Sequence, residues 1–397
     1  MFSIMPQVRR DPLWARADEF ATDPRPDRLD LIVGVYRDDT GCSPIMSAVK
    51  AAEARLFELE TTKQYVAPYG NAGFNAALTE LVLSDPSLTA RATTIQTVAG
   101  TGALRLLADF LAFTGPERTI HLGTPAYVNH PGVLNAARLR IKEYPLVRDG
   151  TLNAEAVLAA AGSANRGDVL LLQGCCHNPT GLSMSIAVWE ELAKILADRG
   201  VVPFVDHAYF GLGDGLDEDL TGMRRLLRVV PAAVVSVSCS KIWGLYRERT
   251  GCAIVLTSNT ADTAYTRDLL EWIARATYSQ PPSHGAAIAE LVLTDPGLRA
   301  DWRAELTTMR ERLNANRAAL VAGLTGGPLG TTDHPAFDGI AQQRGMFLTL
   351  PLSPEQMDQL TARHAIYGTP TGRINLAGIP TPRIDEVAAA IRNVSQH

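Results

Sequence analysis

The sequence predicts an α/β fold in which a mostly parallel sheet is covered by helices. From about residue 93, short apolar and β-branched runs alternate with segments of helical period. These runs are apolar at nearly every position, which is typical of strands buried on both faces. Strands that alternate with helices in this way favour a parallel sheet with its helices packed on the faces.

Seven short apolar runs are the predicted strands of this sheet. In chain order they are Thr94–Val98, Thr119–Gly123, Leu139–Tyr144, Asp168–Gly174, Val201–Asp206, Val234–Ser238 and Cys252–Leu256. Helical patterns lie between them, for example at 102–113 and 186–200. In the second of these, Gly200 is the expected end of the helix, because glycine readily takes the left-handed conformation of a helix end. One face of that helix carries Trp189, Leu192, Ile195 and Leu196.

A long helix and a shorter α/β segment follow the predicted sheet. Apolar residues at helical spacing predict a connecting helix over 300–324, and the expected break follows at Gly326-Gly327-Pro328. The apolar residues are Trp302, Leu306, Met309, Leu313 and Leu320. We expect a large domain over 43–308 and a small domain built from 1–42 and 309–397.

The last part of the chain predicts a βαβα unit within the small domain. A strand is expected in 345–352, and Ser353 with Gln356 forms the sequence of a capping box at the start of a helix, with Pro354 at its first position. The segment RINLAG then precedes a last helix, which we expect Thr381-Pro382 to open.

Composition excludes several classes of protein. The 397 residues include 37 basic and 42 acidic ones, a net charge of −5, so an excess of positive charge for a nucleic-acid backbone is absent. No apolar run is long enough to span a bilayer, and the charges of the first ten residues do not fit a secretion signal. We therefore expect a cytoplasmic protein that binds neither nucleic acid nor membrane.

The five cysteines indicate neither a disulfide framework nor a metal site. Their number is odd, two are adjacent, and none has the paired spacing of a zinc or redox motif. They are Cys42, Cys175, Cys176, Cys239 and Cys252. We expect reduced thiols and no metal.

Four local signals lie at the ends of predicted strands, where open α/β sheets bind their ligands. The first is Gly100-Thr101-Gly102, between a strand and a helix. Glycine permits a close approach of the backbone, and a helix N-terminus offers free N–H groups to a phosphate. Taken alone, the same three residues are also compatible with a simple turn.

The second and third signals are polar residues after two buried strands. His177-Asn178-Pro179-Thr180-Gly181 follows one of them, and Asp206-His207-Ala208-Tyr209 ends the other. An Asn-Pro pair is common in loops, and the carboxylate of Asp206 is equally suited to cap the next helix.

The fourth signal is Ser238-Cys239-Ser240-Lys241, which closes another apolar strand, with Arg249 eight residues later. An isolated lysine at a strand end is usually a solvated surface group. The four signals together change this interpretation. A phosphate-binding helix start, an Asn, an Asp–Tyr pair, a Lys and an Arg on successive strands are the parts needed to hold pyridoxal 5′-phosphate (PLP) as a Schiff base.

With these residues in place, the sequence resembles the aspartate/aromatic aminotransferases, which are class I aminotransferases and fold-type-I PLP enzymes. The resemblance covers nearly the whole chain. The matching segments are Asp11-Pro12, VGVYRDDTG (33–41), ETTKQY (60–65), AGTGALRLLADFLA (99–112), Pro125 with Asn129-His130, GCCHNPTG (174–181), DHAYFG (206–211), SKIWGLYRERTG (240–251), YSQPPSHGA (278–286), QRGMF (343–347) and GRINLAG (372–378).

The resemblance implies a role for each cofactor-binding residue. Lys241 would be the Schiff-base lysine and the base that moves the substrate's Cα proton, and Asp206 would pair with the pyridine nitrogen. The phenolic oxygen would be bound by Asn178 and Tyr209, and Tyr127 would stack on the ring. The phosphate would be held by Gly100, Thr101, Gly102, Ser238, Ser240 and Arg249, with Tyr65 reaching it from a partner subunit.

The resemblance also implies the substrate contacts. Arg373 would bind the α-carboxylate in a bidentate manner, and Arg275 would reach across a homodimer to a side-chain carboxylate. The remaining substrate-binding residues would be Gly34, Tyr127, Asn178 and Arg16. A homodimer with shared active sites is therefore expected.

Three positions depart from the family pattern. Tyr127 replaces the usual Trp over the ring, and Gln173 stands where a His commonly backs the aspartate on the pyridine nitrogen. Arg16 occupies a position near the substrate entrance that is usually apolar. It is either a solvated surface residue or a contact for a larger, more polar substrate.

The sequence thus favours an aminotransferase that moves the amino group of a dicarboxylic or aromatic L-amino acid to a 2-oxo acid by a ping-pong mechanism. The alternative is a specialised biosynthetic PLP enzyme on the same scaffold, which carries out Cβ/Cγ elimination, replacement or carbon–carbon bond formation on a larger polar substrate. A non-catalytic PLP-fold sensor is disfavoured, because Lys241, Asp206 and both arginines are retained.

Overall fold

A computed structural model describes residues 12–326 and 335–396. The chain divides into two compact units. Unit 2 comprises 44–312 with 343–345, and unit 1 comprises 1–43, 313–342 and 346–397. The expected helix break at Gly327-Pro328 and the first matching residue, Asp11, lie outside the described residues.

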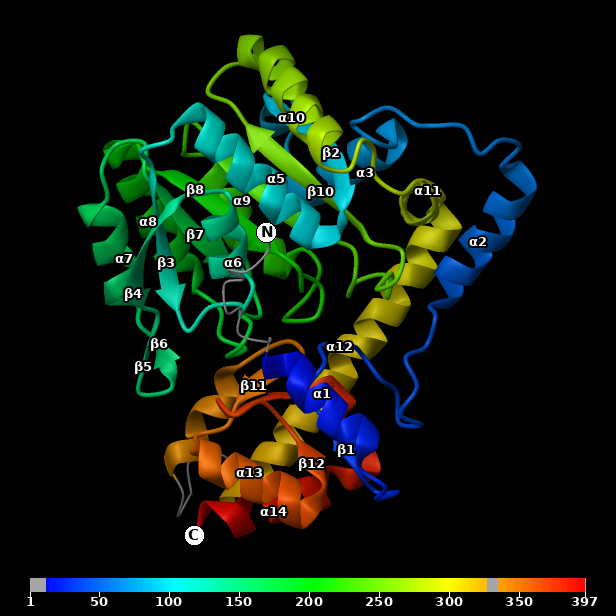
Figure 1. The fold of residues 1–397 in the computed structure, drawn as a ribbon, viewed down its shortest axis with the longest axis vertical. Coiled ribbons are helices and arrows are strands. Elements are labelled where there is room, and N and C mark those ends of the chain that lie inside the picture. Colours follow the sequence, from blue (N-terminus) through cyan, green and yellow to red (C-terminus); the bar gives the residue numbers. More distant parts are fainter. Residues whose placement is uncertain (1–11, 327–334, 397) are drawn as a thin grey trace, which may run out of the picture. The chain divides into compact units, whose positions relative to one another are not determined.

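Unit 2 is built on a seven-stranded sheet (Figure 1). Its strands are β2 (Ala92–Val98), β3 (Thr119–Thr124), β4 (Arg140–Pro145), β7 (Val169–Gln173), β8 (Val202–His207), β9 (Ala233–Ser238) and β10 (Thr250–Leu256). The order across the sheet is β2-β10-β9-β8-β7-β3-β4. Only β10 runs antiparallel to its neighbours; the pairs β9-β8, β8-β7, β7-β3 and β3-β4 are parallel. The predicted α/β fold with a mostly parallel seven-stranded sheet is confirmed.

Helices cover this sheet. They are α2 (Ser47–Leu59), α3 (Ala72–Leu83), α4 (Pro86–Thr89), α5 (Ala99–Thr114), α6 (His130–Ala136), α7 (Ala154–Ser163), α8 (Ile186–Arg199), α9 (Glu218–Leu227), α10 (Thr263–Thr277), α11 (His284–Thr294) and the first part of α12 (Pro296–Thr325). The apolar side of α5 packs with Ile95, Ile120 and Phe204 of the strands in one buried cluster. A short hairpin joins β5 (Val147–Arg148) to β6 (Thr151–Leu152), and a 3₁₀ turn covers Thr260–Asp262.

The two helices analysed in most detail from the sequence form as their patterns predict. In α8, Trp189, Leu192 and Leu196 are buried, and Gly200 ends the helix with φ +68°. Ile195, on the same face, is half-buried. The α12 helix buries all five of its predicted apolar residues. It continues through the boundary between the two units at 312 and 313.

Unit 1 joins the N-terminal segment to the end of the chain. Its elements are α1 (Pro12–Thr22), β1 (Leu29–Asp30), a 3₁₀ segment (Pro335–Gln342), β11 (Phe347–Thr349), α13 (Pro354–His364), β12 (Ile366–Tyr367), β13 (Arg373–Asn375), two 3₁₀ turns (Leu376–Gly378, Thr381–Arg383) and α14 (Ile384–Ser395). β1 pairs with β12 in parallel, and β11 pairs with β13 antiparallel. A separate buried cluster lies beneath them.

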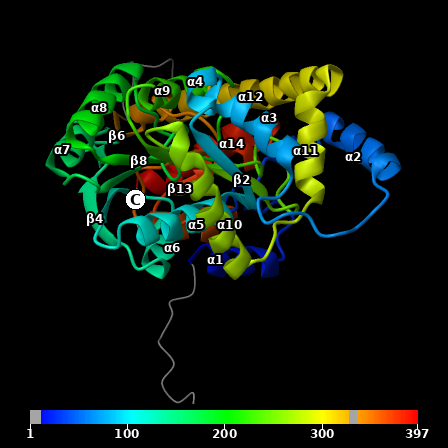
Figure 2. The same cartoon turned by 90° about the horizontal axis from the view of Figure 1, so that it is seen from above.

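One predicted helix start is corrected and another is confirmed. The expected capping box forms at α13, where Ser353 and Gln356 each bind the other's backbone N–H. Thr381-Pro382 does not open the last α-helix, because residues 381–383 form a 3₁₀ turn and α14 begins at Ile384. None of the helices described, viewed from above in Figure 2, is long and apolar enough to span a membrane.

Candidate active site

Three neighbouring strands of the unit 2 sheet carry the polar residues that the sequence singled out. Asn178 follows β7, Asp206 lies near the end of β8, and Lys241 follows β9. Since β7, β8 and β9 are parallel neighbours, their carboxyl ends lie at one edge of the sheet. The topology therefore brings these residues together although 63 positions separate the first from the last.

Asp206 is held by two side chains. One carboxylate oxygen lies 2.9 Å from Nε2 of His130, and the other accepts a hydrogen bond from the Ser236 hydroxyl at 2.7 Å. Burial raises the pKa of this carboxyl, but the hydrogen bonds and the nearby imidazole outweigh burial, and the pKa of Asp206 lies below its ordinary value. The carboxylate is therefore kept ionised, and the alternative role as a helix cap is not seen, because α9 begins only at Glu218.

His130 and Ser236 are site residues that the sequence analysis did not assign. His130 lies in a segment that matches the family pattern, but the sequence carries no local signal for its role. His130 is the first residue of α6, and Ser236 lies on β9, opposite Asp206 in the strand register. The contact between Ser236 and Asp206 follows from the β8–β9 register. The sequence alone does not supply that register, so it offered no signal for Ser236.

Lys241, Tyr209 and Asn178 form a connected group. The Lys241 ammonium lies 5.2 Å from the centre of the Tyr209 ring, and Nδ2 of Asn178 donates to the Tyr209 hydroxyl at 3.4 Å. Burial, with a smaller contribution from Arg249, lowers the pKa of Lys241 to about 8, although Asp206 acts in the opposite direction. A substantial fraction of this amine is therefore neutral near pH 8, where it can act as a nucleophile or a base.

The start of α5 lies beside the β9 end. Ala99 begins the helix with φ +57°, and the preceding residue, Val98, makes no side-chain cap. A Cβ atom added to Gly100 would lie 2.9 Å from the Cβ of Ser238, so only glycine fits this contact. The backbone N–H of Ser240 donates to the Ser238 hydroxyl at 3.3 Å. Uncapped N–H groups of a long helix, next to two serines, are suited to bind an anion.

Arg249 contacts the start of α5 through its backbone. Its carbonyl accepts a hydrogen bond from the Ala99 N–H at 2.8 Å, and its backbone has φ +51°. Its exposed guanidinium donates to the Tyr246 carbonyl at 3.0 Å. A non-glycine residue in the left-handed region is uncommon and is often found at functional sites. Thr101 is exposed in the first turn of α5, next to Gly102.

The two departures in unit 2 have clear contacts. The Tyr127 ring packs edge to face on His130, with 5.3 Å between ring centres. Gln173 does not back Asp206. Its side-chain amide donates to the Asn178 carbonyl at 2.9 Å and accepts from the Asn178 N–H at 2.8 Å. The glutamine thus fixes the Asn178 backbone, and Asp206 keeps an imidazole partner in His130.

In unit 1, Arg373 lies next to Gly34 and Phe347. The Arg373 guanidinium is 4.7 Å from the centre of the Phe347 ring and donates to the Ile32 carbonyl at 2.7 Å. A Cβ atom at Gly34 would lie 2.5 Å from the same ring. The ring and the carbonyl fix the orientation of a buried guanidinium, which is the arrangement that bidentate carboxylate binding requires.

Arg16 is neither solvated nor without partners. Its guanidinium donates to Glu19 at 2.7 Å and also pairs with Asp358 of α13. Its side chain is only 14% exposed. These two ion pairs join α1 to α13 within unit 1, and they differ from the solvated residue that the sequence left as one alternative. A contact between Arg16 and substrate remains a prediction.

Tyr65 and Arg275 lie at the surface of unit 2. Tyr65 is 93% exposed, in a stretch without regular secondary structure that follows α2. Arg275 is exposed in the last turn of α10, where it donates to the Ser279 hydroxyl. Neither residue belongs to the group around Lys241 within the chain described.

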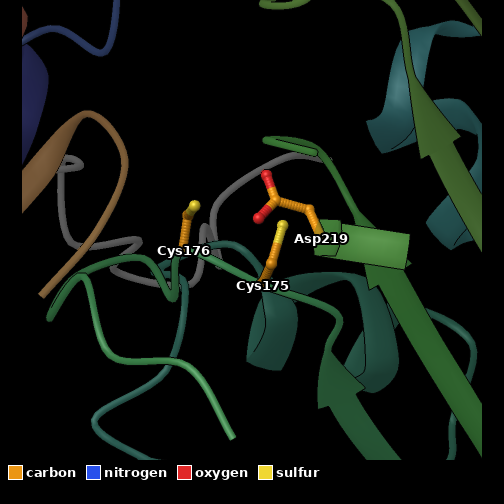
Figure 3. Close-up of side chains that lie close together, drawn as sticks. All are labelled: Cys175, Cys176 and Asp219. Atoms are coloured by element: carbon orange, nitrogen blue, oxygen red, sulfur yellow. The ribbon is translucent and has the colours of Figure 1, made fainter. Parts of the chain in front are cut away.

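Cys175, Cys176 and Asp219 are the described groups that could hold a metal ion, since their ligand atoms lie within 4.8 Å of one another (Figure 3). The Asp219 carboxylate, however, accepts backbone N–H groups of Gly211 and Gly213 and of Asp214 at 2.7–2.9 Å. The hydrogen bond with Cys176 and burial raise the pKa of the Cys175 thiol. The Asp219 carboxylate therefore holds the loop at 211–214. None of the five cysteines forms a disulfide.

The geometry of the unit 2 residues fits PLP. An ionised buried carboxylate offers a partner to a protonated ring nitrogen, and an amine with a pKa of about 8 can bond to an aldehyde. The start of α5, which has no side-chain cap, offers N–H groups suited to a phosphate. The three features lie together at the carboxyl ends of neighbouring strands.

Comparisons with known proteins agree with this geometry. Residues 26–391 match the family model described as aminotransferase class I and II. The chain is 44% identical to a tyrosine aminotransferase of Rhizobium meliloti over 98% of both chains, and 37% identical to an aspartate aminotransferase of Escherichia coli over 98% of this chain and 99% of the other.

A solved structure shows the same likeness together with the cofactor. The aromatic-amino-acid aminotransferase from Burkholderia pseudomallei, covalently bound to pyridoxal phosphate, superposes with a TM-score of 0.94. It is 35% identical to this chain, and the match covers 99% of each. A family match over most of the chain and relatives above 30% identity over nearly its whole length leave one conclusion: the chain belongs to the class I and II aminotransferases and is a PLP-dependent enzyme.

Proposed function

We propose that this enzyme transfers the amino group of an aromatic or dicarboxylic L-amino acid to a 2-oxo acid by a ping-pong mechanism. The observation that carries the proposal is the connected group of Asn178, Tyr209 and Lys241 at the sheet edge where His130 and Ser236 hold Asp206. The names of the two relatives support both substrate classes. Amino acids and 2-oxo acids are the substrates of the family.

PLP, when bound, supplies an electron sink for the negative charge that develops at the substrate's Cα. Lys241 would hold the cofactor covalently and would serve as the base for the Cα proton. Its lowered pKa makes the neutral amine available for this role. Asp206, whose carboxylate stays ionised beside His130, would pair with the pyridine nitrogen and keep it protonated.

The other residues around the group bind and orient. Asn178 and Tyr209 would bind the phenolic oxygen, and Tyr127 would stack on the ring. The phosphate would be held by Gly100, Thr101, Gly102, Ser238, Ser240 and Arg249, of which the α5 residues offer uncapped N–H groups. Arg373 binds the substrate's α-carboxylate, beside Gly34.

We propose further that the enzyme is a homodimer in which Tyr65 binds the partner's phosphate and Arg275 binds the side-chain carboxylate of the partner's substrate. The support is the exposure of both residues in the single chain. Phe57 and Leu59, just before the Tyr65 segment, are large apolar side chains that are also exposed. Exposed apolar residues gathered in this way mark interaction surfaces. The cytoplasmic location stays a prediction.

Two experiments test the proposal. Borohydride reduction followed by peptide mapping should place the pyridoxyl label on Lys241, and a label on another lysine would refute the assignment. A half-reaction with a panel of amino acids, followed by absorbance, should convert the cofactor fully to its amine form with phenylalanine, tyrosine or aspartate. Release of a side-chain fragment instead would favour the specialised biosynthetic alternative.

Arg275 permits a sharper test of side-chain specificity. Arg275→Leu should lower kcat/KM for aspartate by about 10-fold to 100-fold, the value of a charge-assisted hydrogen bond, and leave phenylalanine nearly unchanged. Arg140→Leu, another exposed arginine of the unit, is the matched control. Equal losses on both substrates would show that Arg275 does not contact the side chain.

A further inference from the structure

A groove of about 280 Å³ lies along the first half of β2. Its walls come from α3, the start of β2, Tyr69 and Arg267 of α10, and Figure 2 shows α3 and α10 beside β2. We call it the edge groove. Ala92 lines it, whereas Val98 at the other end of β2 precedes the helix start proposed for phosphate. Six residues of strand separate the two, roughly 20 Å.

The edge groove contains a free strand edge. β2 is the outermost strand, with β10 as its one neighbour in the sheet. Arg91 and Ala99, at the two ends of β2, pair with the β10 side through Thr257 N–H and the Arg249 carbonyl. The backbone N–H and C=O groups of odd-numbered β2 residues therefore point toward β10. Those of even-numbered residues point away from the sheet, since the two directions alternate along the ladder.

The outward-facing groups of β2 are unpaired within the groove. Gln96 faces outward and donates its N–H to the Tyr69 carbonyl at 2.9 Å. Thr94 and Ala92, the next outward residues, each present an N–H and a carbonyl, and in the described part of the chain these groups have no hydrogen-bond partner. An unpaired edge of this kind readily binds a ligand that carries donors and acceptors.

Arg267 supplies an unpaired positive charge. Its exposed guanidinium lies 5.8 Å from the centre of the Tyr69 ring. Among the described residues, no carboxylate lies within ion-pair distance of it, and no acidic side chain lines the groove. A guanidinium beside an aromatic ring is suited to bind a carboxylate and to shield it from water.

Asn75 forms part of the wall of the groove. The residue is 6% exposed, and its Nδ2 donates to the Tyr69 carbonyl at 2.9 Å. Its Oδ1 is buried and has no hydrogen-bond partner. A buried amide oxygen without a partner costs free energy and is closed to a ligand in the groove. The small side chains of Ala76 and Ala92 leave an apolar floor between the outward backbone of β2 and the Arg267 guanidinium.

From these features we propose that the edge groove binds an α-amino acid with an apolar side chain, as the zwitterion. Arg267 binds the carboxylate, the outward carbonyls of β2 accept from the ammonium, and the side chain lies on the alanine floor beside the Tyr69 ring. The volume suits one small molecule. The proposal does not depend on the catalytic roles given to Lys241 or Arg373.

Equilibrium dialysis on the borohydride-reduced holoenzyme tests this site, because the reduced enzyme cannot consume the amino acid. The probes are L-phenylalanine, phenylpyruvate, which lacks the ammonium, and phenethylamine, which lacks the carboxylate. The wild type should bind one more phenylalanine per chain than Arg267→Met, whose remaining affinity for the groove should be about 10-fold to 100-fold weaker. Neither of the other probes should fill this site at the same concentration.

Arg140→Met is the matched control, since Arg140 is an exposed arginine on β4, the opposite edge strand of the sheet. It should bind as the wild type does. Arg267 is itself exposed, so its variant should keep the fold, and the far-UV spectrum checks this. The same number of phenylalanine molecules on the wild type and Arg267→Met would overturn the proposal. Phenylpyruvate bound as tightly as phenylalanine would refute the zwitterion.

Discussion

Two buried aspartates in unit 2 are held in opposite ways. Asp206 on β8 contacts the side chains of His130 and Ser236, and its pKa lies below the ordinary value. Asp219 on α9 accepts three backbone N–H groups of the loop at 211–214, yet burial and the nearby Asp214 keep its pKa above the ordinary value.

The difference shows that the number of hydrogen bonds does not decide the charge of a buried carboxyl. Asp219 has more hydrogen bonds to backbone N–H groups but lies near another acid, whereas Asp206 has the His130 imidazole and the Ser236 hydroxyl as partners, which favour its carboxylate. The Asp206 carboxyl is arranged to stay ionised. The Asp219 carboxyl holds the backbone of the 211–214 loop in place.

Replacing each aspartate by asparagine separates the two roles, and the largest effect is on activity. Asp206→Asn should lower kcat/KM by about 10²-fold to 10³-fold or more, because a neutral amide cannot hold the proton of the pyridine nitrogen. Asp219→Asn should stay within about 10-fold of the wild type. Steady-state kinetics with the same amino acid measure both. Similar losses in the two variants would remove the distinction.

His207 tests whether acid sensitivity comes from either aspartate. It follows Asp206 on β8, but its ring points to the opposite face, against Phe210 and close to Gly174. Burial lowers the pKa of His207 to about 4, and neither ring nitrogen has a partner. The unfolded chain binds this proton near pH 6.5, so the contribution of His207 to stability is complete above pH 6.5 and is lost as the pH falls to about 4.

His207→Leu should therefore reduce the loss of unfolding free energy between pH 6.5 and 4, by about 3 kcal/mol if the whole shift is realised. Urea unfolding at several pH values measures it. His284→Leu, at an exposed histidine, should leave the acid dependence as it is. A wild-type slope in His207→Leu would assign the sensitivity to other groups, such as His177, whose pKa burial lowers to about 3.

The sequence predicts the sheet well and the contacts within the site less well. All seven predicted strands form within a few residues of their expected ends, because apolar β-branched runs carry their own signal. The roles of Lys241 and Asp206 were predicted from their order along the chain together with the family resemblance, and they stay predictions. The hydrogen bond between His130 and Asp206 joins residues 76 positions apart, and a single sequence has no local signal for such a contact.

Gln173 shows the same limit in a different form. The sequence indicated a departure from the family pattern at this position, and from that a change behind Asp206. The contact of Gln173 with the Asn178 backbone depends on the loop after β7 turning back on the strand. The direction in which this loop turns is a property of the tertiary structure. The two hydrogen bonds between the Gln173 amide and the Asn178 backbone therefore become visible only in the structure.

Asp219→Asn should act on stability instead of activity. The asparagine keeps one acceptor but turns an N–H₂ group toward backbone N–H groups of the 211–214 loop, which leaves one or two of them unsatisfied. A buried donor without a partner costs about 1–3 kcal/mol of unfolding free energy. Urea unfolding at neutral pH measures the loss. No change in stability would show that the loop holds its shape without the carboxylate.

The smallest effect is the sign of the pH dependence that each aspartate contributes. The folded pKa of Asp206 lies below the unfolded value of 3.8, so its contribution to stability is present above pH 3.8 and is lost as the pH falls through the folded pKa. The folded pKa of Asp219 lies above 3.8, so its contribution is present below pH 3.8 and is lost as the pH rises through the folded pKa.

Compared with the wild type, Asp206→Asn should therefore flatten the acid side of the stability curve below pH 3.8. Asp219→Asn should steepen the rise of stability just above pH 3.8, because the wild-type carboxyl opposes that rise. The differences are expected to be small, so paired urea unfolding series across pH 3–5 are needed. Changes of the same sign in both variants would mean that the two carboxyls share one environment, contrary to their contacts.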